Sequence, residues 1–272
     1  MKHAFASPSA LLGIAIAVLG CCAGVGTWTT SHAAPGATPT GSAAVPKGPG
    51  SLSGLWLNAN YKGTGRFPAR ERVLRTSDGS MPPLLPAAAA VLEARIKDAD
   101  AGDIFANTLT ECLPGGIPEM LFGAPYPIQI LETPGQVSML FEEQNHFRLI
   151  FLKGGHASDP DPSYMGDAVG HWEGDTLVVD TIGLNDKTTL DMVGTPHTEA
   201  LHVVERYRRV AQDRLEVTVR IEDPGTFSKP WETKVTYQAA PAGTRVGEYI
   251  CDNNRNLPDA AGHTSFQGAQ GN

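Results

Sequence analysis

The pattern that sets the fold class is the stretch Val169-Gly-His-Trp-Glu-Gly-Asp-Thr-Leu-Val-Val-Asp-Thr-Ile182. Its two halves are short apolar runs interspersed with polar residues, and Glu173-Gly174-Asp175 lies between them. Short alternating runs are typical of β-strands with one buried face, and glycine flanked by acidic residues is typical of a tight turn. The stretch therefore predicts a β-hairpin.

Similar runs, separated by Gly, Pro, Asn and Asp, fill most of the chain after Pro125. They predict an all-β fold of about ten antiparallel strands, which suits a closed barrel or a two-layer sandwich. We favour the barrel, loosely lipocalin-like, because Gly54-Leu-Trp56 resembles the Gly-x-Trp sequence that opens lipocalin barrels. The expected strands cover residues 55–57, 128–131, 137–141, 147–151, 169–172, 176–182, 201–207, 215–221, 231–237 and 244–250.

One helix is expected on the N-terminal side of these strands. Pro86 suits a first helical turn, the following residues are good helix formers, and Gly102 suits a helix end. Leu92 and Ile96 are four residues apart, so they would share the buried face of this helix.

The first 33 residues have the features of a secretory signal peptide. Lys2 precedes the apolar run of residues 10–20, and Ser31-His-Ala33 resembles a leader peptidase site. We expect cleavage after Ala33, which gives a periplasmic or secreted protein without membrane insertion. The alternative is a lipoprotein anchored through an acylated Cys21.

The rest of the chain divides by composition. Residues 34–50 are rich in Pro and Gly, so we expect a disordered linker. Residues 51–256 are enough for one domain with a substantial core, which would be the barrel. The small and polar residues 257–272 are expected to form a flexible tail.

The charge of the chain indicates which binding partners to expect, and its cysteines bear on the compartment in which it folds. The formal net charge is −8 and no block of Lys and Arg occurs, which argues against binding to nucleic acid or an anionic membrane. Cys112 and Cys251 are the cysteines that remain after leader cleavage. In an oxidising compartment they predict one disulfide.

Three residues are candidates for acid–base catalysis. His156 and His197 follow glycine and proline turns, so they would lie in loops at a barrel mouth and could reach a ligand, or each could cap a backbone carbonyl. Glu205 shares the apolar, inward face of its strand with Val203 and Tyr207. A carboxylate there could act as a general acid or base, or it could form a buried ion pair with Arg148 or Arg220.

Other polar side chains would line the same mouth. Tyr164 lies in a proline-stiffened loop, and we expect it to assist substrate binding together with His171 and Tyr207. No cofactor is predicted, because the chain lacks a serine-hydrolase elbow and nucleotide-binding motifs. No dedicated metal-ligand motif occurs either, although a divalent metal held by residues from separate strands, as in cupins, remains an alternative.

Several motifs in the chain resemble a large uncharacterised family of secreted bacterial β proteins. The resemblance covers residues 52–255 and transfers no catalytic residue or substrate. In that pattern a proline follows the first loop histidine, whereas this chain has Ala157 after His156. The motifs are Cys112-Leu-Pro-Gly-Gly-Ile-Pro118, Gly166-Asp-Ala-Val-Gly-His-Trp-Glu-Gly-Asp-Thr-Leu-Val-Val-Asp180, Gly194-Thr-Pro-His197, Val203-Val-Glu-Arg206, Glu222-Asp-Pro224 and Lys229-Pro-Trp231.

These features together predict a periplasmic enzyme that acts on a small organic molecule by acid–base chemistry, as a lyase, hydratase, isomerase or hydrolase. His156, His197 and Glu205 would carry the chemistry. A competing hypothesis is a lipocalin-like carrier that holds a small hydrophobic ligand without reaction. A third is a metal-dependent, cupin-like enzyme.

Overall fold

The computed structural model describes residues 51–61, 67–102, 112–122, 125–249 and 251, which all belong to one compact unit, residues 44–272. The expected leader with Cys21, the linker and the tail lie outside the described residues. Among the described residues, no helix combines the length and the apolar character that a membrane crossing requires.

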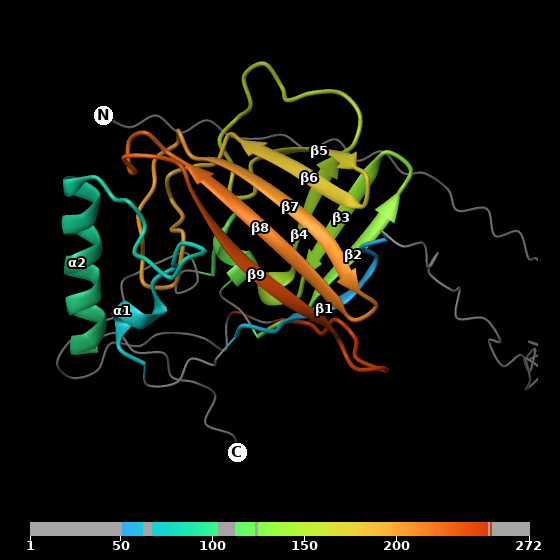
Figure 1. The fold of residues 1–272 in the computed structure, drawn as a ribbon, viewed down its shortest axis with the longest axis horizontal. Coiled ribbons are helices and arrows are strands. Elements are labelled where there is room, and N and C mark those ends of the chain that lie inside the picture. The colour runs from blue at the N-terminus through green and yellow to red at the C-terminus, as the bar shows by residue number, and fades with distance from the viewer. Residues whose placement is uncertain (1–50, 62–66, 103–111, 123–124, 250, 252–272) are drawn as a thin grey trace, which may run out of the picture. The chain divides into compact units, whose positions relative to one another are not determined.

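The fold is a closed β-barrel, as the sequence predicted, with strands in the order β1 to β9 around the barrel (Figure 1). The strands are β1 (Gly54–Asn58), β2 (Ile128–Thr133), β3 (Gln136–Phe141), β4 (His146–Phe151), β5 (Asp167–Glu173), β6 (Thr176–Ile182), β7 (His202–Ala211), β8 (Arg214–Glu222) and β9 (Trp231–Ala239). The helices are α1 (Ala69–Arg72), α2 (Pro86–Ala101), α3 (Glu119–Phe122) and the short 3-10 helix η1 (Glu143–Asn145).

The predicted β5–β6 hairpin and the predicted long helix are both confirmed. Glu173 pairs with Thr176 across the turn of the β5–β6 hairpin, where Gly174 has a φ of 63°. The α2 helix begins at Pro86, and Gly102 ends it with a left-handed φ of 96°. Such a φ suits glycine, which has no Cβ to clash with the preceding carbonyl.

The prediction of an all-antiparallel sheet was wrong at one seam. β4 and β5 run parallel and meet at Phe151 and Val169, whereas every other neighbouring pair is antiparallel. A parallel pair needs a crossover of about a dozen residues or more, and residues 152–166 supply it. Gly170 lets the strands approach here, because a Cβ at this position would lie 2.8 Å from Ile150 Cγ2.

The tenth strand, expected at residues 244–250, is absent from the described residues of that segment. The reason is that β9 pairs with β1 and closes the barrel, which leaves no free edge for another strand. The segment instead lies against η1 and the residue before it. Gly247 N donates to Glu142 Oε2 at 2.6 Å, and Tyr249 N donates to Asn145 Oδ1 at 3.2 Å.

The predicted disulfide is confirmed just beyond this segment. Cys251 is joined to Cys112, with their Cα atoms 5.5 Å apart. The bond links the end of the described chain to the segment that leads into α3. It spans 139 residues of sequence, so it restricts the unfolded chain over most of the domain.

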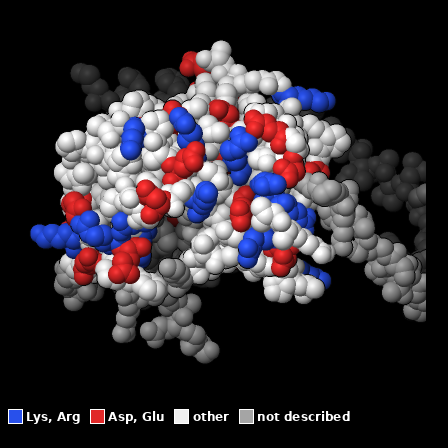
Figure 2. Space-filling model, viewed as in Figure 1, with Lys and Arg blue, Asp and Glu red and all other residues white. Residues whose placement is uncertain are grey.

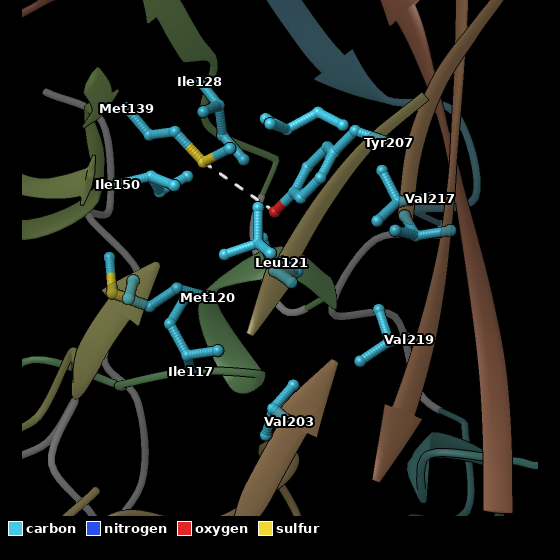
Figure 3. Close-up of a cluster of buried hydrophobic side chains, with 14 of the residues drawn as sticks. Ile117, Met120, Leu121, Ile128, Met139, Ile150, Val203, Tyr207, Val217 and Val219 are labelled. Carbon is cyan, nitrogen blue, oxygen red and sulfur yellow. Dashed lines mark hydrogen bonds between the residues drawn. The ribbon is translucent and has the colours of Figure 1, made fainter. Parts of the chain in front are cut away.

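The barrel interior is a filled core. Every second residue of the strands points inward and is buried, and the helix α3 adds Met120 and Leu121 from one end. Figure 3 shows Leu121 below the ring of Tyr207, whose hydroxyl points toward the Met139 sulfur. The void between Trp56, Met139 and Tyr207 has a volume of only about 10 Å³.

One ion pair lies inside this apolar core. Arg148 of β4 donates to both carboxylate oxygens of Glu205 on β7, at 2.8 and 2.5 Å, and also to Thr181 Oγ1 of β6 at 2.7 Å. The Tyr207 hydroxyl donates to Glu205 Oε1 at 2.6 Å. The Arg148 and Glu205 side chains are 1% and 0% exposed, so protein groups alone stabilise both charges.

Ion pairs on the outer face of the barrel are exposed to solvent, unlike the pair between Arg148 and Glu205. Figure 2 shows acidic and basic side chains interspersed over the face that it presents. Arg206 contacts Glu173 at 2.6 Å across the outside of β5–β7, and both side chains are nearly half exposed. Solvent screens such pairs, so they contribute little to stability.

We predict that Glu205→Gln destabilises the barrel strongly. The substitution leaves the Arg148 guanidinium buried without a counter-charge, which costs about 3–5 kcal/mol of the free energy of unfolding. Urea unfolding followed by tryptophan fluorescence measures this loss. Glu173→Gln, which breaks the exposed pair with Arg206, serves as the control and should cost less than about 1 kcal/mol. Equal losses in the two variants would contradict a central role for the buried pair.

Candidate functional site

Four ionisable side chains meet on the outside of the barrel at the start of β5 and β7. Asp167 opens β5, Asp180 lies in β6 and His202 opens β7. The pairing of Val169 with Asp180, and of Asp180 with Val204, places the three side chains on the same outward face. His156 joins them from the β4–β5 connection. We call these four residues the His–Asp cluster.

Asp180 joins the two histidines of the cluster. His156 Nε2 lies 2.9 Å from Asp180 Oδ1, and His202 Nε2 lies 3.0 and 3.1 Å from the two oxygens of the same carboxylate. Asp167 Oδ2 contacts the other nitrogen of His156 at 3.1 Å and accepts a hydrogen bond from Ala157 N at 2.9 Å. An ionised carboxylate only accepts hydrogen bonds, so each of these ring nitrogens donates a proton.

The two histidines differ in how many of their ring nitrogens are engaged. Both nitrogens of His156 contact carboxylates, so its ring is held between Asp167 and Asp180. His202 donates through Nε2, and its Nδ1 has no partner among the described residues. The His202 side chain is 35% exposed. Its Nδ1 is therefore the one ring nitrogen of the cluster that is open to a substrate.

The β4–β5 connection holds His156 in place. Ser163 N donates to Gly183 O, and Asn185 N donates to Ser163 O, both at 2.9 Å, so the connection adds a short parallel bridge beside the end of β6. The carbonyl of Tyr164 accepts a hydrogen bond from Ile117 N at 3.3 Å. Tyr164 thus lies in the same β4–β5 connection as His156, and it is the backbone carbonyl of Tyr164 that accepts the hydrogen bond from Ile117.

His197 is not part of the cluster. It is 7% exposed, its Nδ1 donates to the Thr198 carbonyl at 3.0 Å, and its Nε2 accepts from Thr188 Oγ1 at 2.7 Å. Burial lowers the pKa of His197, which favours the neutral ring that this bonding pattern needs. Both nitrogens are occupied, which matches the carbonyl-capping alternative that the sequence left open.

Glu205 and Tyr207 lie inside the barrel, away from any surface. Arg148 and the Tyr207 hydroxyl engage the oxygens of Glu205, which matches the buried ion pair rather than a free base. Burial raises the pKa of Tyr207 well above its usual range. His171 lies on the outside near the β5–β6 turn, where Nε2 contacts Glu173 Oε1 at 3.1 Å, and it is 63% exposed. No hydrogen bond among the described residues links His171 to the His–Asp cluster.

A second group of acids, which the sequence analysis missed, lies beneath the same end of the barrel. Glu119 of α3 is 2% exposed and neither of its carboxyl oxygens has a hydrogen-bond partner in the described part of the chain. A Cβ on Gly115 would lie 2.0 Å from Glu119 Oε2, so glycine makes room for this carboxyl. Glu143 of η1 is 6% exposed, and its Oε2 also has no partner among the described residues.

Both acids are held in their protonated form by their surroundings. Burial raises the pKa of Glu143 to about 7. Burial also raises the pKa of Glu119 well above its usual range, and the neighbouring acidic groups of Glu143 and Asp191 raise it further. The pair is enclosed, so a substrate has no access to it in this conformation. Within the described ranges, no set of three or more His, Cys, Asp or Glu side chains is arranged to hold a metal ion.

We predict that Glu143 makes the fold less stable as the pH rises. The folded protein keeps this proton up to about pH 7, whereas the unfolded chain loses it near its ordinary pKa of 4.5. Stability therefore falls between about pH 4.5 and 7 and stays at the lower level above pH 7. Relative to wild type, Glu143→Gln should gain about 2 kcal/mol between about pH 5 and 8 in urea unfolding. The exposed Glu216→Gln is the control, and a pH-independent difference from wild type in Glu143→Gln would refute the assignment.

Comparison of the chain with protein-family models, with curated proteins and with solved structures found no significant match to any of them.

Proposed function

We propose that this protein is an enzyme that transfers protons to or from a small organic substrate at the His–Asp cluster. The observation that carries the proposal is the hydrogen bond from His202 Nε2 to Asp180, which leaves Nδ1 without a partner among the described residues in a side chain that is 35% exposed. A histidine that donates one nitrogen to a carboxylate has a fixed tautomer and orientation. Its other nitrogen can then accept a proton from substrate or from water.

The surrounding residues suit supporting roles. Asp180 orients His202, and the ring of His156 holds Asp180 in place from the other side. Asp167 in turn fixes His156. Relative to the expectation from sequence, His156 changes from the proton-transferring group to a positioning group, because neither of its nitrogens is free. His202 takes over the proton transfer.

This chemistry fits reactions that begin with proton abstraction or with activation of water. Those include the lyase, hydratase, isomerase and hydrolase classes. We infer that the reaction takes place in the periplasm or outside the cell, because residues 1–33 have the pattern of a leader and Cys112 is joined to Cys251. Carriage of a ligand inside the barrel is less well supported, since an interior void of about 10 Å³ is no larger than a water molecule needs.

We predict that His202→Gln and Asp180→Asn each lower kcat/KM by about 100-fold or more. The first removes the proton acceptor and the second removes the group that fixes its tautomer. The measurement is turnover of a panel of activated esters, enolisable ketones and β-hydroxy acids that wild type is first shown to convert. His146→Gln, at the start of β4 and outside the cluster, is the matched control and should keep wild-type turnover.

A second measurement tests the arrangement without a substrate. Nitrogen NMR of the imidazole rings, at a pH high enough for the His202 ring to be neutral, should show its proton on Nε2 and none on Nδ1, and Asp180→Asn should abolish this preference. A mixture of both tautomers in wild type, or unchanged turnover in His202→Gln, would rule out the proposed role.

A further inference from the structure

A pocket of about 450 Å³ lies at the end of the barrel where α1 is found. Residues 67–77, which include α1, form one side of it, and Thr233 and Lys234 of β9 form another. Phe122 of α3 lines it as well. The volume falls within the range of about 300–1,000 Å³ that is typical of small-molecule sites. It shares no lining residue with the His–Asp cluster.

The lining of this pocket is apolar over much of its surface. Phe67 is 42% exposed, although its ring is one of the largest apolar side chains in the described chain. Covering such surface with an apolar ligand is favourable by about 25 cal/mol per Å². The apolar residues that line the pocket are Phe67, Val73, Leu74, Phe122 and Met192.

Positive charge prevails among the side chains that are free to meet a ligand. Arg72, Arg75 and Lys234 line the pocket, and of these the side chains of Arg72 and Lys234 form no hydrogen bond or ion pair with another described residue. Arg75 donates to the Arg70 carbonyl at 2.8 Å, a bond that leaves its charge uncompensated. Glu71 is the acidic residue that opposes them.

Asp191 also lines the pocket, but protein donors already occupy its carboxylate. Its Oδ1 accepts from the backbone nitrogens of Val193, Gly194 and Thr195 at 3.0, 2.9 and 3.1 Å. Its Oδ2 accepts from Leu74 N at 2.9 Å and from the Thr195 hydroxyl at 2.5 Å. These five bonds hold the Asp191 carboxylate in place and occupy its oxygens, while its negative charge adds to that of Glu71. The three cations Arg72, Arg75 and Lys234 still outnumber these two acids on the lining.

We infer that this pocket binds a small organic acid with an apolar body, whose carboxylate pairs with Arg72 and Lys234. An apolar wall beside unpaired cations matches the two parts of such a ligand. A neutral apolar molecule would leave both cations without a partner, and a cationic one would meet like charge. The inference is independent of the proposed catalysis, because the two sites have no residue in common.

Isothermal titration calorimetry with decanoate, below its micelle-forming concentration, tests this inference on the full chain. Decanoate should bind to wild type at one site, and decyltrimethylammonium, which has the same alkyl chain and the opposite charge, should bind at least about tenfold more weakly. No binding of decanoate, or equally tight binding of the cationic probe, would overturn the inference.

Variants locate the binding site. The double variant Arg72→Gln/Lys234→Gln should weaken decanoate binding by about tenfold or more, and both residues are exposed, so the fold should be retained. Lys153→Gln, which removes a lysine beside the β2–β3 turn, should leave the affinity unchanged. Phe147→Ser tests the other exposed apolar face, on β4, where the side chain is 60% exposed. Weaker binding in Phe147→Ser, or wild-type affinity in the double variant, would place the ligand elsewhere and refute the assignment.

Discussion

The buried ion pair between Arg148 and Glu205 is the interaction on which the packing inside the barrel depends. It connects β4 with β7 through the interior, and Thr181 and the Tyr207 hydroxyl add hydrogen bonds to it, while Arg148 Nε is buried without a partner among the described residues. A charged pair is stable in an apolar core only when its partners are held rigidly, because neither ion can be solvated by water. The side chains that provide this rigidity fill the space that a lipocalin-like carrier would need for a ligand. Within the described part of the chain, the His–Asp cluster lies on the outer face of the barrel, and the pocket beside α1 shares no lining residue with the interior void.

The parallel pairing of β4 with β5 explains why ionisable groups gather on one part of the outer face. Since both strands run in the same direction, residues 152–166 must return along the outside of the barrel before β5 can begin. This return brings His156 over β6, where it meets Asp180. An antiparallel hairpin at the same place would have joined β4 to β5 by a tight turn and left Asp180 with His202 alone.

Most features that the sequence predicted correctly depend on neighbouring residues. The β5–β6 hairpin follows from its alternation and its Gly174 turn, and the α2 helix from Pro86 and Gly102. The disulfide joins cysteines 139 residues apart, and it could be predicted because residues 34–272 contain two cysteines. The missed features depend on distant contacts. The β9–β1 pairing that excludes a tenth strand cannot be read from residues 244–250, and Arg148 was one of two arginines that the sequence offered as the partner of Glu205.

The candidate site was only partly predictable for the same reason. The inward alternation of Leu177, Val179 and Thr181 in β6 implies that Asp180 points outward, and this signal was available in the sequence. Which histidine Asp180 contacts depends on the register of β6 with β7 and on the β4–β5 crossover. Neither the register nor the crossover can be read from the residues that neighbour Asp180 in the sequence. His156 was recognised because it follows a turn, whereas His202 lies within the expected strand 201–207 and was not among the residues predicted to be catalytic.

Several ionisable groups among the described residues lie in three different environments. Glu205, His197 and Asp191 are enclosed and hydrogen-bonded, so they are fixed but their polar atoms are occupied. Glu119 and Glu143 are enclosed, and both oxygens of Glu119 and Oε2 of Glu143 have no hydrogen-bond partner among the described residues, so burial favours their protonated forms and no substrate can reach them. His202 is fixed through Nε2 and open at Nδ1. Fixed orientation together with an accessible atom is what acid–base catalysis requires, and within the described chain His202 meets both conditions.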